Sequence, residues 1–260
     1  MAYKFELTKD RSAVNGKYTF TFVGNSHKAV VPVLQRRRSG EYRIIGTGFY
    51  LIRPNIFITA AHIFKGNDIN DDDSFSVLLE DAPDPIPLTH KYNHESLDIA
   101  FFILDSTSAD YLEDVNPLAV MNMLPIKNEV VAIFGYSHSD VDPMNKCEID
   151  DGEAMQNTIL RSKWELGGVL GIHDSGRGFV KGQCFETSVL AEGRDSGAPM
   201  FNGNGFVIGL LSRSFKFESG LPNSTCTSIL QIGDIPIDGK PIRELWNRKH
   251  RTAFCKQNWQ

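Results

Sequence analysis

The chain is a succession of short runs rich in Val, Ile, Phe and Thr, separated by glycine, proline and aspartate. Runs of about four to eight such residues between turn-forming residues are typical of β-strands in sandwiches and barrels. The expected strands lie at residues 18–23, 29–34, 44–52, 56–60, 75–79, 99–104, 130–134, 179–189, 206–212 and 227–232. No segment keeps a helical period before the end of the chain. The pattern predicts an all-β fold.

The C-terminal segment has a different pattern. Pro241 precedes apolar residues that are spaced by three and four, from Ile242 to Phe254. Proline is favoured in the first turn of a helix, and this spacing places apolar side chains on one helical face. The sequence therefore predicts a C-terminal amphipathic helix.

The length of the chain sets its domain organisation. With 260 residues, it fits one large β domain or two smaller lobes that share a cleft. The polar segment 105–125 separates two sets of expected strands. We expect an N-terminal extension packed over one lobe (residues 1–27), an N-terminal β-barrel (28–122), a C-terminal β-barrel (123–237), and a C-terminal helix and tail (238–260).

Charge and cysteine content exclude several classes of protein. The net charge of -5 argues against general nucleic-acid binding, which needs basic patches. No apolar run approaches the ~18 residues that cross a bilayer, and the N-terminus has no secretory-signal pattern. The 4 cysteines are widely spaced, as is typical of reduced thiols rather than of disulfides or zinc sites. We expect a cytoplasmic protein with no metal or cofactor and no membrane or nucleic-acid partner.

Three polar residues are candidates for catalysis. Ser196 lies in the segment R-D-S-G-A-P, where the following glycine permits a tight bend. His62 ends the segment T-A-A-H, and Asp98 directly precedes an apolar run, where a carboxylate needs a hydrogen-bonding partner. A serine hydroxyl becomes a nucleophile when a base takes its proton and a third group orients that base. Taken singly, each residue also fits a structural role in a loop, strand end or turn.

Together, the segments T-A-A-H, L-D-I-A and R-D-S-G-A-P resemble the chymotrypsin/trypsin-like serine peptidases in their order along the chain. Residues 46–52 resemble the small-residue strand before the histidine, and 207–212 resemble the strand that flanks the substrate. The resemblance implies two six-stranded antiparallel β-barrels with the active cleft between them. It also implies a serine endopeptidase that cleaves protein or peptide substrates through a triad of His62, Asp98 and Ser196 and an acyl-enzyme intermediate.

The resemblance assigns the oxyanion hole to the backbone N–H groups of Arg194 and Ser196. The family usually has glycine where this chain has Arg194, and an arginine with positive φ is strained. We therefore expect a hole that is imperfect until a substrate or partner arrives. No I-V-G-G activation site precedes the first core strand, so the chain is more similar to intracellular or bacterial members. Only about 64 residues follow Ser196, so we expect no PDZ domain.

The specificity pocket follows from the same resemblance. Its base would be Leu190 and its wall would include Ser212, Arg213 and Ser214. Leucine offers no countercharge, so we expect an apolar or small substrate side chain rather than lysine or arginine; alternatively, Arg213 reaches an acidic substrate residue. Ser212 is also expected to hydrogen-bond Asp98.

Three functional interpretations remain open at this point. The first is an active serine endopeptidase. The second is a binding module of the same fold that has little turnover, because its oxyanion hole is poorly formed. The third is a peptidase that stays inactive until a regulatory protein partner docks. The intact candidate triad favours catalysis, whereas Arg194 keeps the other two interpretations open.

Overall fold

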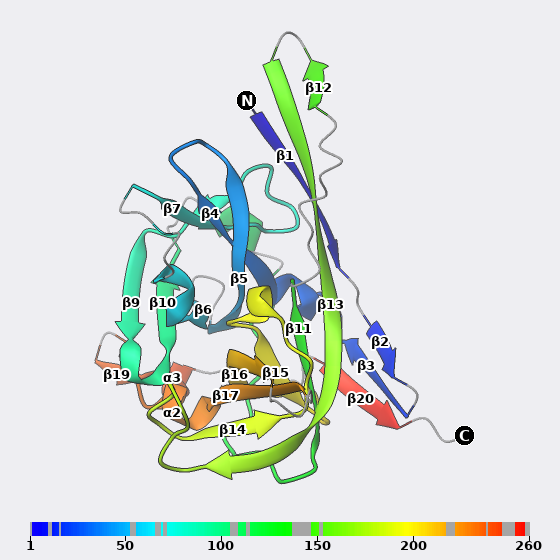
Figure 1. Cartoon of the computed structure of the whole chain (residues 1–260), viewed down its shortest axis with the longest axis vertical. Helices are drawn as coiled ribbons and strands as arrows, with labels where there is room; N and C mark the ends of the chain where they lie inside the picture. The colour runs from blue at the N-terminus through cyan, green and yellow to red at the C-terminus, as the bar shows by residue number, and fades with distance from the viewer. Residues whose placement is uncertain are drawn as a thin grey trace.

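Most of the chain forms β-strands, arranged in two lobes and an N-terminal extension (Figure 1). The structure is a computed structural model, and it describes residues 2–9, 12–15, 17–52, 56–65, 69, 72–104, 109–112, 115–136, 147–150, 153–216, 222–237, 239–245 and 253–257. The mainly β architecture expected from the sequence is confirmed.

The C-terminal lobe is a closed antiparallel barrel. Its six strands follow the order β13 (Glu153–His173), β11 (Val130–Gly135), β15 (Pro199–Asn202), β16 (Val207–Lys216), β17 (Pro222–Ser228) and β14 (Cys184–Thr187). The first and last of these strands also pair with each other, which closes the barrel. Its interior is filled by fully buried apolar side chains that include Val131, Phe185, Met200 and Ile208.

The N-terminal lobe is an open sheet. Its 7 strands follow the order β8 (Ile86–Pro87), β7 (Ser74–Val77), β4 (Val30–Arg36), β5 (Tyr42–Ile52), β6 (Ile56–Ala60), β10 (Ile99–Ile103) and β9 (His90–His94). Within the described ranges, no pairing joins β8 to β9, so the expectation of a second closed barrel is wrong. The edge strand β8 has only 2 residues, and Pro85 and Pro87 have no N–H to extend its ladder.

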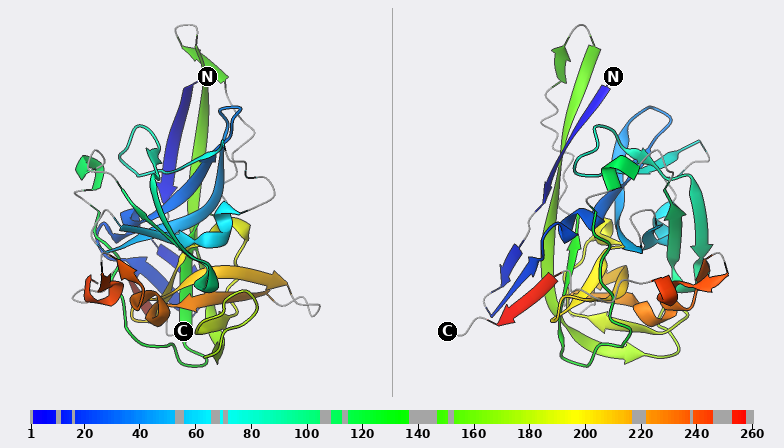
Figure 2. Two further views of the ribbon diagram at one scale, coloured as in Figure 1. Left: turned by 90° about the vertical axis from the view of Figure 1, so that its left-hand side faces the viewer. Right: turned by 180° about the vertical axis from the view of Figure 1, so that it is seen from behind.

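The N-terminal extension attaches to segments that are distant in sequence. β1 (Ala2–Lys9) runs parallel to β13, whose outer end also pairs with β12 (Cys147–Asp150). Figures 1 and 2 show β13 as a long strand that extends beyond both lobes, with β1 beside it. A separate sheet joins β2 (Ser12–Asn15), β3 (Tyr18–Phe22) and β20 (Ala253–Gln257). The domain boundaries expected from the sequence stay predictions.

The expected C-terminal helix does not extend to the end of the apolar spacing. Helix α3 spans Ile242–Leu245, residues 246–252 lie outside the described residues, and Ala253 and Phe254 belong to strand β20. Pairing of β20 with β3 satisfies the backbone groups along one edge of β20, and on β3 the ring centroid of Phe22 lies 4.5 Å from that of Trp164. Tertiary pairing has therefore overridden the helical spacing, because three-and-four spacing over a few residues does not exclude a strand.

The remaining elements are short. They are α1 (Ala109–Leu112), α2 (Ile229–Gly233), β18 (Pro236–Ile237), β19 (Lys240–Pro241) and the 3-10 helices η1 (Ser26–Ala29), η2 (Ala61–Phe64), η3 (Glu95–Leu97) and η5 (Gly193–Asp195). Among the residues described, no helix has the length and apolar character needed to cross a membrane.

Replacing Gly205 with alanine tests the docking of β20 on the C-terminal lobe. Gly205 has φ +79°, and an added Cβ would lie 1.5 Å from the carbonyl oxygen of Ala253. We expect Gly205→Ala to lower the free energy of unfolding by about 3 kcal/mol or more, measured by urea denaturation.

Gly40 provides a matched control for that measurement. It also has positive φ, at +87°, but nothing lies within 4 Å of an added Cβ. Gly40→Ala is therefore expected to show only the backbone strain of about 1–2 kcal/mol. Equal losses for the two variants would contradict the contact between Gly205 and β20.

Candidate active site

His62 and Asp98 come from two neighbouring strands of the N-terminal lobe. Strand β6 leads into η2, which contains His62, while η3 leads through Asp98 into β10. Ala60 pairs with Ile99 across these strands, and the N–H of Ala61 donates to the backbone carbonyl of Asp98 over 3.1 Å. Pairing of β6 with β10 therefore brings the imidazole and the carboxylate side by side.

The carboxylate of Asp98 is buried and fully engaged. Its Oδ1 accepts the backbone N–H of His62 at 2.9 Å, and its Oδ2 lies 2.8 Å from His62 Nδ1. Oδ2 also accepts the hydroxyl of Ser212, so this expected hydrogen bond is confirmed. Asp98 has a left-handed backbone, with φ 55°, which aspartate tolerates better than most residues. These hydrogen bonds offset the desolvation of the charge and hold the residue in place.

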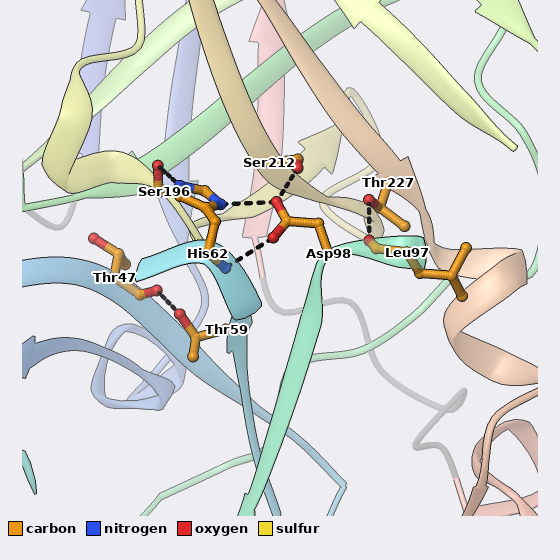
Figure 3. A network of polar contacts seen from close by, with 8 residues as sticks. All are labelled: Thr47, Thr59, His62, Leu97, Asp98, Ser196, Ser212 and Thr227. Atoms are coloured by element: carbon orange, nitrogen blue, oxygen red, sulfur yellow. Dashed lines mark hydrogen bonds and ion pairs between the residues drawn. The ribbon is translucent and has the colours of Figure 1, made fainter. Parts of the chain in front are cut away.

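Ser196 completes the arrangement from the C-terminal lobe, as Figure 3 shows. Its Oγ lies 3.1 Å from Nε2 of His62. Because the Asp98 carboxylate accepts from Nδ1, that nitrogen carries the proton and Nε2 presents a lone pair to the hydroxyl. The His62 side chain is 27% exposed, so part of the ring remains open to solvent. The structure thus brings together the three residues singled out in the sequence.

Ser196 is fixed by backbone contacts with both lobes. The N–H of Thr47, in β5, donates to the carbonyl of Ser196 over 2.9 Å, and the N–H of Gly197 donates to the carbonyl of Leu211 over 2.8 Å. Gly197 has φ +90°, and an added Cβ would lie 2.1 Å from the carbonyl oxygen of Thr47. The bend therefore requires glycine, as the sequence indicated.

Comparison with known proteins shows the family to which this chain belongs. Residues 46–210 match the family model of the trypsin-like peptidase domain. The chain belongs to the trypsin-like peptidase family. A search of curated proteins gives no match.

Solved structures share the fold of this peptidase domain. The active form of the Rv3671c protease from M. tuberculosis is 16% identical, with TM-score 0.53, over 78% of this chain and 77% of that chain. An inactive mutant form of Rv3671c is 16% identical, with TM-score 0.53, over 85% and 87% of the two chains. The MamO protease domain from Magnetospirillum magneticum is 13% identical, with TM-score 0.53, over 80% and 95%. At these identities, the similarity concerns the fold alone.

The turn before Ser196 has a conformation that bears on the expected oxyanion donors. Gly193–Asp195 forms the 3-10 helix η5, a geometry in which each carbonyl faces the N–H three residues ahead. Regular geometry of this kind would direct the carbonyl of Gly193 toward the N–H of Ser196. Because the C=O and N–H of a trans peptide point in opposite directions, the N–H of Arg194 would then face away from that space.

Two residues around η5 stabilise this conformation. Glu192 and Asp195 form a reciprocal capping box, in which the N–H of Glu192 donates to Asp195 Oδ2 over 3.0 Å. The N–H of Asp195 also donates to the carbonyl of Glu192, over 3.0 Å. Among non-glycine residues in the described ranges, only Asp98 and Asn128 have positive φ, so Arg194 avoids the strain expected of a formed hole.

The residues assigned to the specificity pocket have different environments. Leu190 is 45% exposed, and Ser214 is also exposed. Ser212 is buried against Asp98, whereas Arg213 is half-buried, with its guanidinium over the ring of Phe179. The roles of these four residues in substrate binding stay predictions.

Thr47 has a role that the sequence did not reveal. Its fully buried hydroxyl donates to the carbonyl of Arg194 over 3.0 Å and accepts the N–H of Tyr136 over 3.2 Å. Its carbonyl accepts the hydroxyl of Thr59 over 2.6 Å. In the sequence, Thr47 appeared only as a small residue between two glycines, which gives no signal of these distant partners.

In the part of the chain that the structure describes, the cysteines and the potential metal ligands form neither a disulfide nor a metal site. Cys184, Cys226 and Cys255 are free thiols, and burial raises the pKa of Cys226 well above its usual value. No group of 3 or more His, Cys, Asp and Glu residues in these ranges is arranged to hold a metal ion. The absence of a metal or cofactor stays a prediction.

Replacing Thr47 with valine tests the link between β5 and the nucleophile turn. Valine has nearly the same shape but leaves the Arg194 carbonyl and the Tyr136 N–H without their partner. We expect Thr47→Val to lower the free energy of unfolding by about 1–3 kcal/mol in urea denaturation. Thr47→Ser keeps the hydroxyl and should recover most of this loss; a serine variant as unstable as the valine variant would contradict the role of the hydroxyl.

Proposed function

We propose that this chain is a serine endopeptidase that cleaves protein or peptide substrates through Ser196, His62 and Asp98. The observation that carries the proposal is the continuous chain of hydrogen bonds from Asp98 Oδ2 through the His62 ring to Ser196 Oγ, at 2.8 and 3.1 Å. Such a chain makes the hydroxyl reactive because the base is already oriented toward its proton. The family membership supports the same function.

The reaction proceeds in two halves. Ser196 Oγ attacks the scissile carbonyl carbon while His62 Nε2 takes the hydroxyl proton, and Asp98 stabilises the resulting imidazolium. The tetrahedral intermediate breaks its C–N bond as His62 returns the proton to the leaving amine, which leaves an ester on Ser196. Water then attacks this ester with His62 again acting as base. The second product is a carboxylic acid, and Ser196 regains its proton.

The free edge of β16 is the proposed binding site for the substrate backbone. β15 pairs with β16 only as far as Leu210, whereas β17 pairs with the opposite edge of β16 through Lys216. In the described ranges, one edge of residues 212–216 thus has no strand partner. An extended substrate can add there as an antiparallel strand, with its scissile carbonyl beside Ser196. Leu190 and Ser214 are proposed to contact the substrate near this edge.

Activation by substrate or by a regulatory protein is part of the proposal. Rotation of the Gly193–Arg194 peptide would turn the Arg194 N–H toward the space in front of Ser196 and form the oxyanion hole. The η5 conformation supports this step, because regular 3-10 geometry would direct that peptide in the opposite orientation. The same conformation favours the alternative function, a catalytically weak binding module. A cytoplasmic location is proposed from the free thiols of Cys184 and Cys226.

Labelling with a fluorophosphonate probe tests the nucleophile. We expect the probe to modify the native protein and not the Ser196→Ala variant, since only an activated serine hydroxyl forms the phosphonyl ester. Asp98→Asn should slow peptide hydrolysis by about 10⁴-fold, because the amide favours the wrong imidazole tautomer. Absence of labelling and of hydrolysis from the native protein would leave the binding-module alternative.

Replacing Arg194 with glycine tests the account of the oxyanion hole. Glycine adopts positive φ without strain, so Arg194→Gly should raise kcat/KM about ten-fold, as expected for relief of about 1–2 kcal/mol. Arg194→Ala is the matched control, because it removes the guanidinium but keeps Cβ. A similar rise in both variants would show that the side chain, and not the backbone strain, limits the reaction.

A further inference from the structure

Arg213 lies beside the candidate active site on strand β16. This strand is anchored next to the nucleophile, since the N–H of Gly197 donates to the Leu211 carbonyl over 2.8 Å. Arg213 lies two residues further along β16 than Leu211, just past a β-bulge between them. Its neighbour Ser212 is hydrogen-bonded to Asp98. Arg213 therefore belongs to the free strand edge that the proposed function assigns to the substrate.

The guanidinium of Arg213 is held in place by an aromatic ring. Its central carbon lies 3.7 Å from the ring centroid of Phe179, which is 59% exposed. Stacking on one face leaves the N–H groups at the edge of the guanidinium directed away from the ring. The side chain therefore presents a bidentate donor whose conformation is largely fixed before a ligand arrives.

Among the described residues, no carboxylate compensates the charge of Arg213. Across the barrel sheet, Glu186 lies one strand beyond Thr225, which pairs with Arg213. Glu186 is already engaged, because its Oε1 lies 2.7 Å from Arg177 Nε and its Oε2 lies 3.1 Å from His173 Nε2. Within the described ranges, no carboxylate oxygen lies within ion-pair distance of Arg213.

On the N-terminal lobe near the site, the positive charge of Lys65 is paired with a carboxylate. Lys65, which follows η2, lies 2.5 Å from the carboxylate of Glu95 in η3. Arg213 thus contributes positive charge to this edge of the site without a described counterion. An anionic group of the substrate would supply the missing counterion and would form two charge-assisted hydrogen bonds with the guanidinium.

We propose that Arg213 is a specificity-determining residue that selects substrates with an aspartate or glutamate on the acyl side of the scissile bond. This inference rests on the proposed function. A substrate antiparallel to β16 passes residue 214 before it reaches Ser196, so the residues near Arg213 precede the scissile bond. The selected carboxylate lies about two to four residues before that bond.

Positional peptide libraries test the proposal. Each library fixes glutamate, glutamine or lysine at one position and is measured in two ways: binding to the Ser196→Ala protein and cleavage by the native protein. We expect glutamate to bind and react about five-fold better than glutamine at one position, as for a partly exposed ion pair. Arg213→Gln should abolish this difference, and Arg213→Glu should reverse it in favour of lysine.

Two controls keep the outcome interpretable. Arg38→Gln removes a cation that is 86% exposed and lies in the turn between β4 and β5, so it should leave the preference unchanged. Thermal melts of the Arg213 variants exclude misfolding. Equal binding and cleavage of glutamate and glutamine peptides by the native site would overturn the proposal. Glutamate preference in binding without any turnover would support Arg213 selection while rejecting the peptidase function.

Discussion

The hydrogen bond between the N–H of Thr47 and the carbonyl of Ser196, at 2.9 Å, joins the two lobes at the nucleophile. It connects a strand of the open N-terminal sheet to the nucleophile turn of the closed barrel. His62 and Asp98 belong to the N-terminal lobe, whereas Ser196, and Ser212 that donates to Asp98, belong to the other lobe. Without a fixed joint between the lobes, the distance between Nε2 and Oγ would vary with their relative position. The buried hydroxyl of Thr47 reinforces this joint by bonding the Arg194 carbonyl.

The candidate site was predictable because its chemistry is concentrated in short segments. A buried carboxylate needs a donor, an imidazole needs an acceptor for one of its ring N–H groups, and a serine needs a base. The side chains of Asp98, His62 and Ser196 satisfy one another in the structure. Gly197 was predictable for a similar reason, since a residue with a side chain cannot occupy the bend against Thr47. Residue type therefore carried this information without any knowledge of the full topology.

The parts that sequence patterns did not predict have three different causes, of which the first is long-range pairing. The apolar spacing after Pro241 fits a helix, but Ala253 pairs with Phe22 from the opposite end of the chain, and no local pattern encodes that partner. The open edge of the N-terminal sheet has a local cause in Pro85 and Pro87, which the search for strands did not weigh. The role of Thr47 was invisible for a third reason, because a threonine between glycines is compatible with any buried strand.

The conformation of η5 sets two opposing free energies against each other. Forming the hole by rotation of the Gly193–Arg194 peptide places Arg194 at positive φ, which costs about 1–2 kcal/mol. One oxyanion donor contributes about 3–4 kcal/mol once negative charge develops on the substrate. The strain therefore offsets a large part of the gain, and the charge of the transition state alone is a reduced driving force for the rearrangement. A substrate strand or a docked protein that contributes another 1–2 kcal/mol through contacts near η5 would therefore change the rate about ten-fold. In the proposed activation, the turn before the nucleophile, rather than the hydrogen-bonded chain of Asp98, His62 and Ser196, is the point at which a substrate or partner would act.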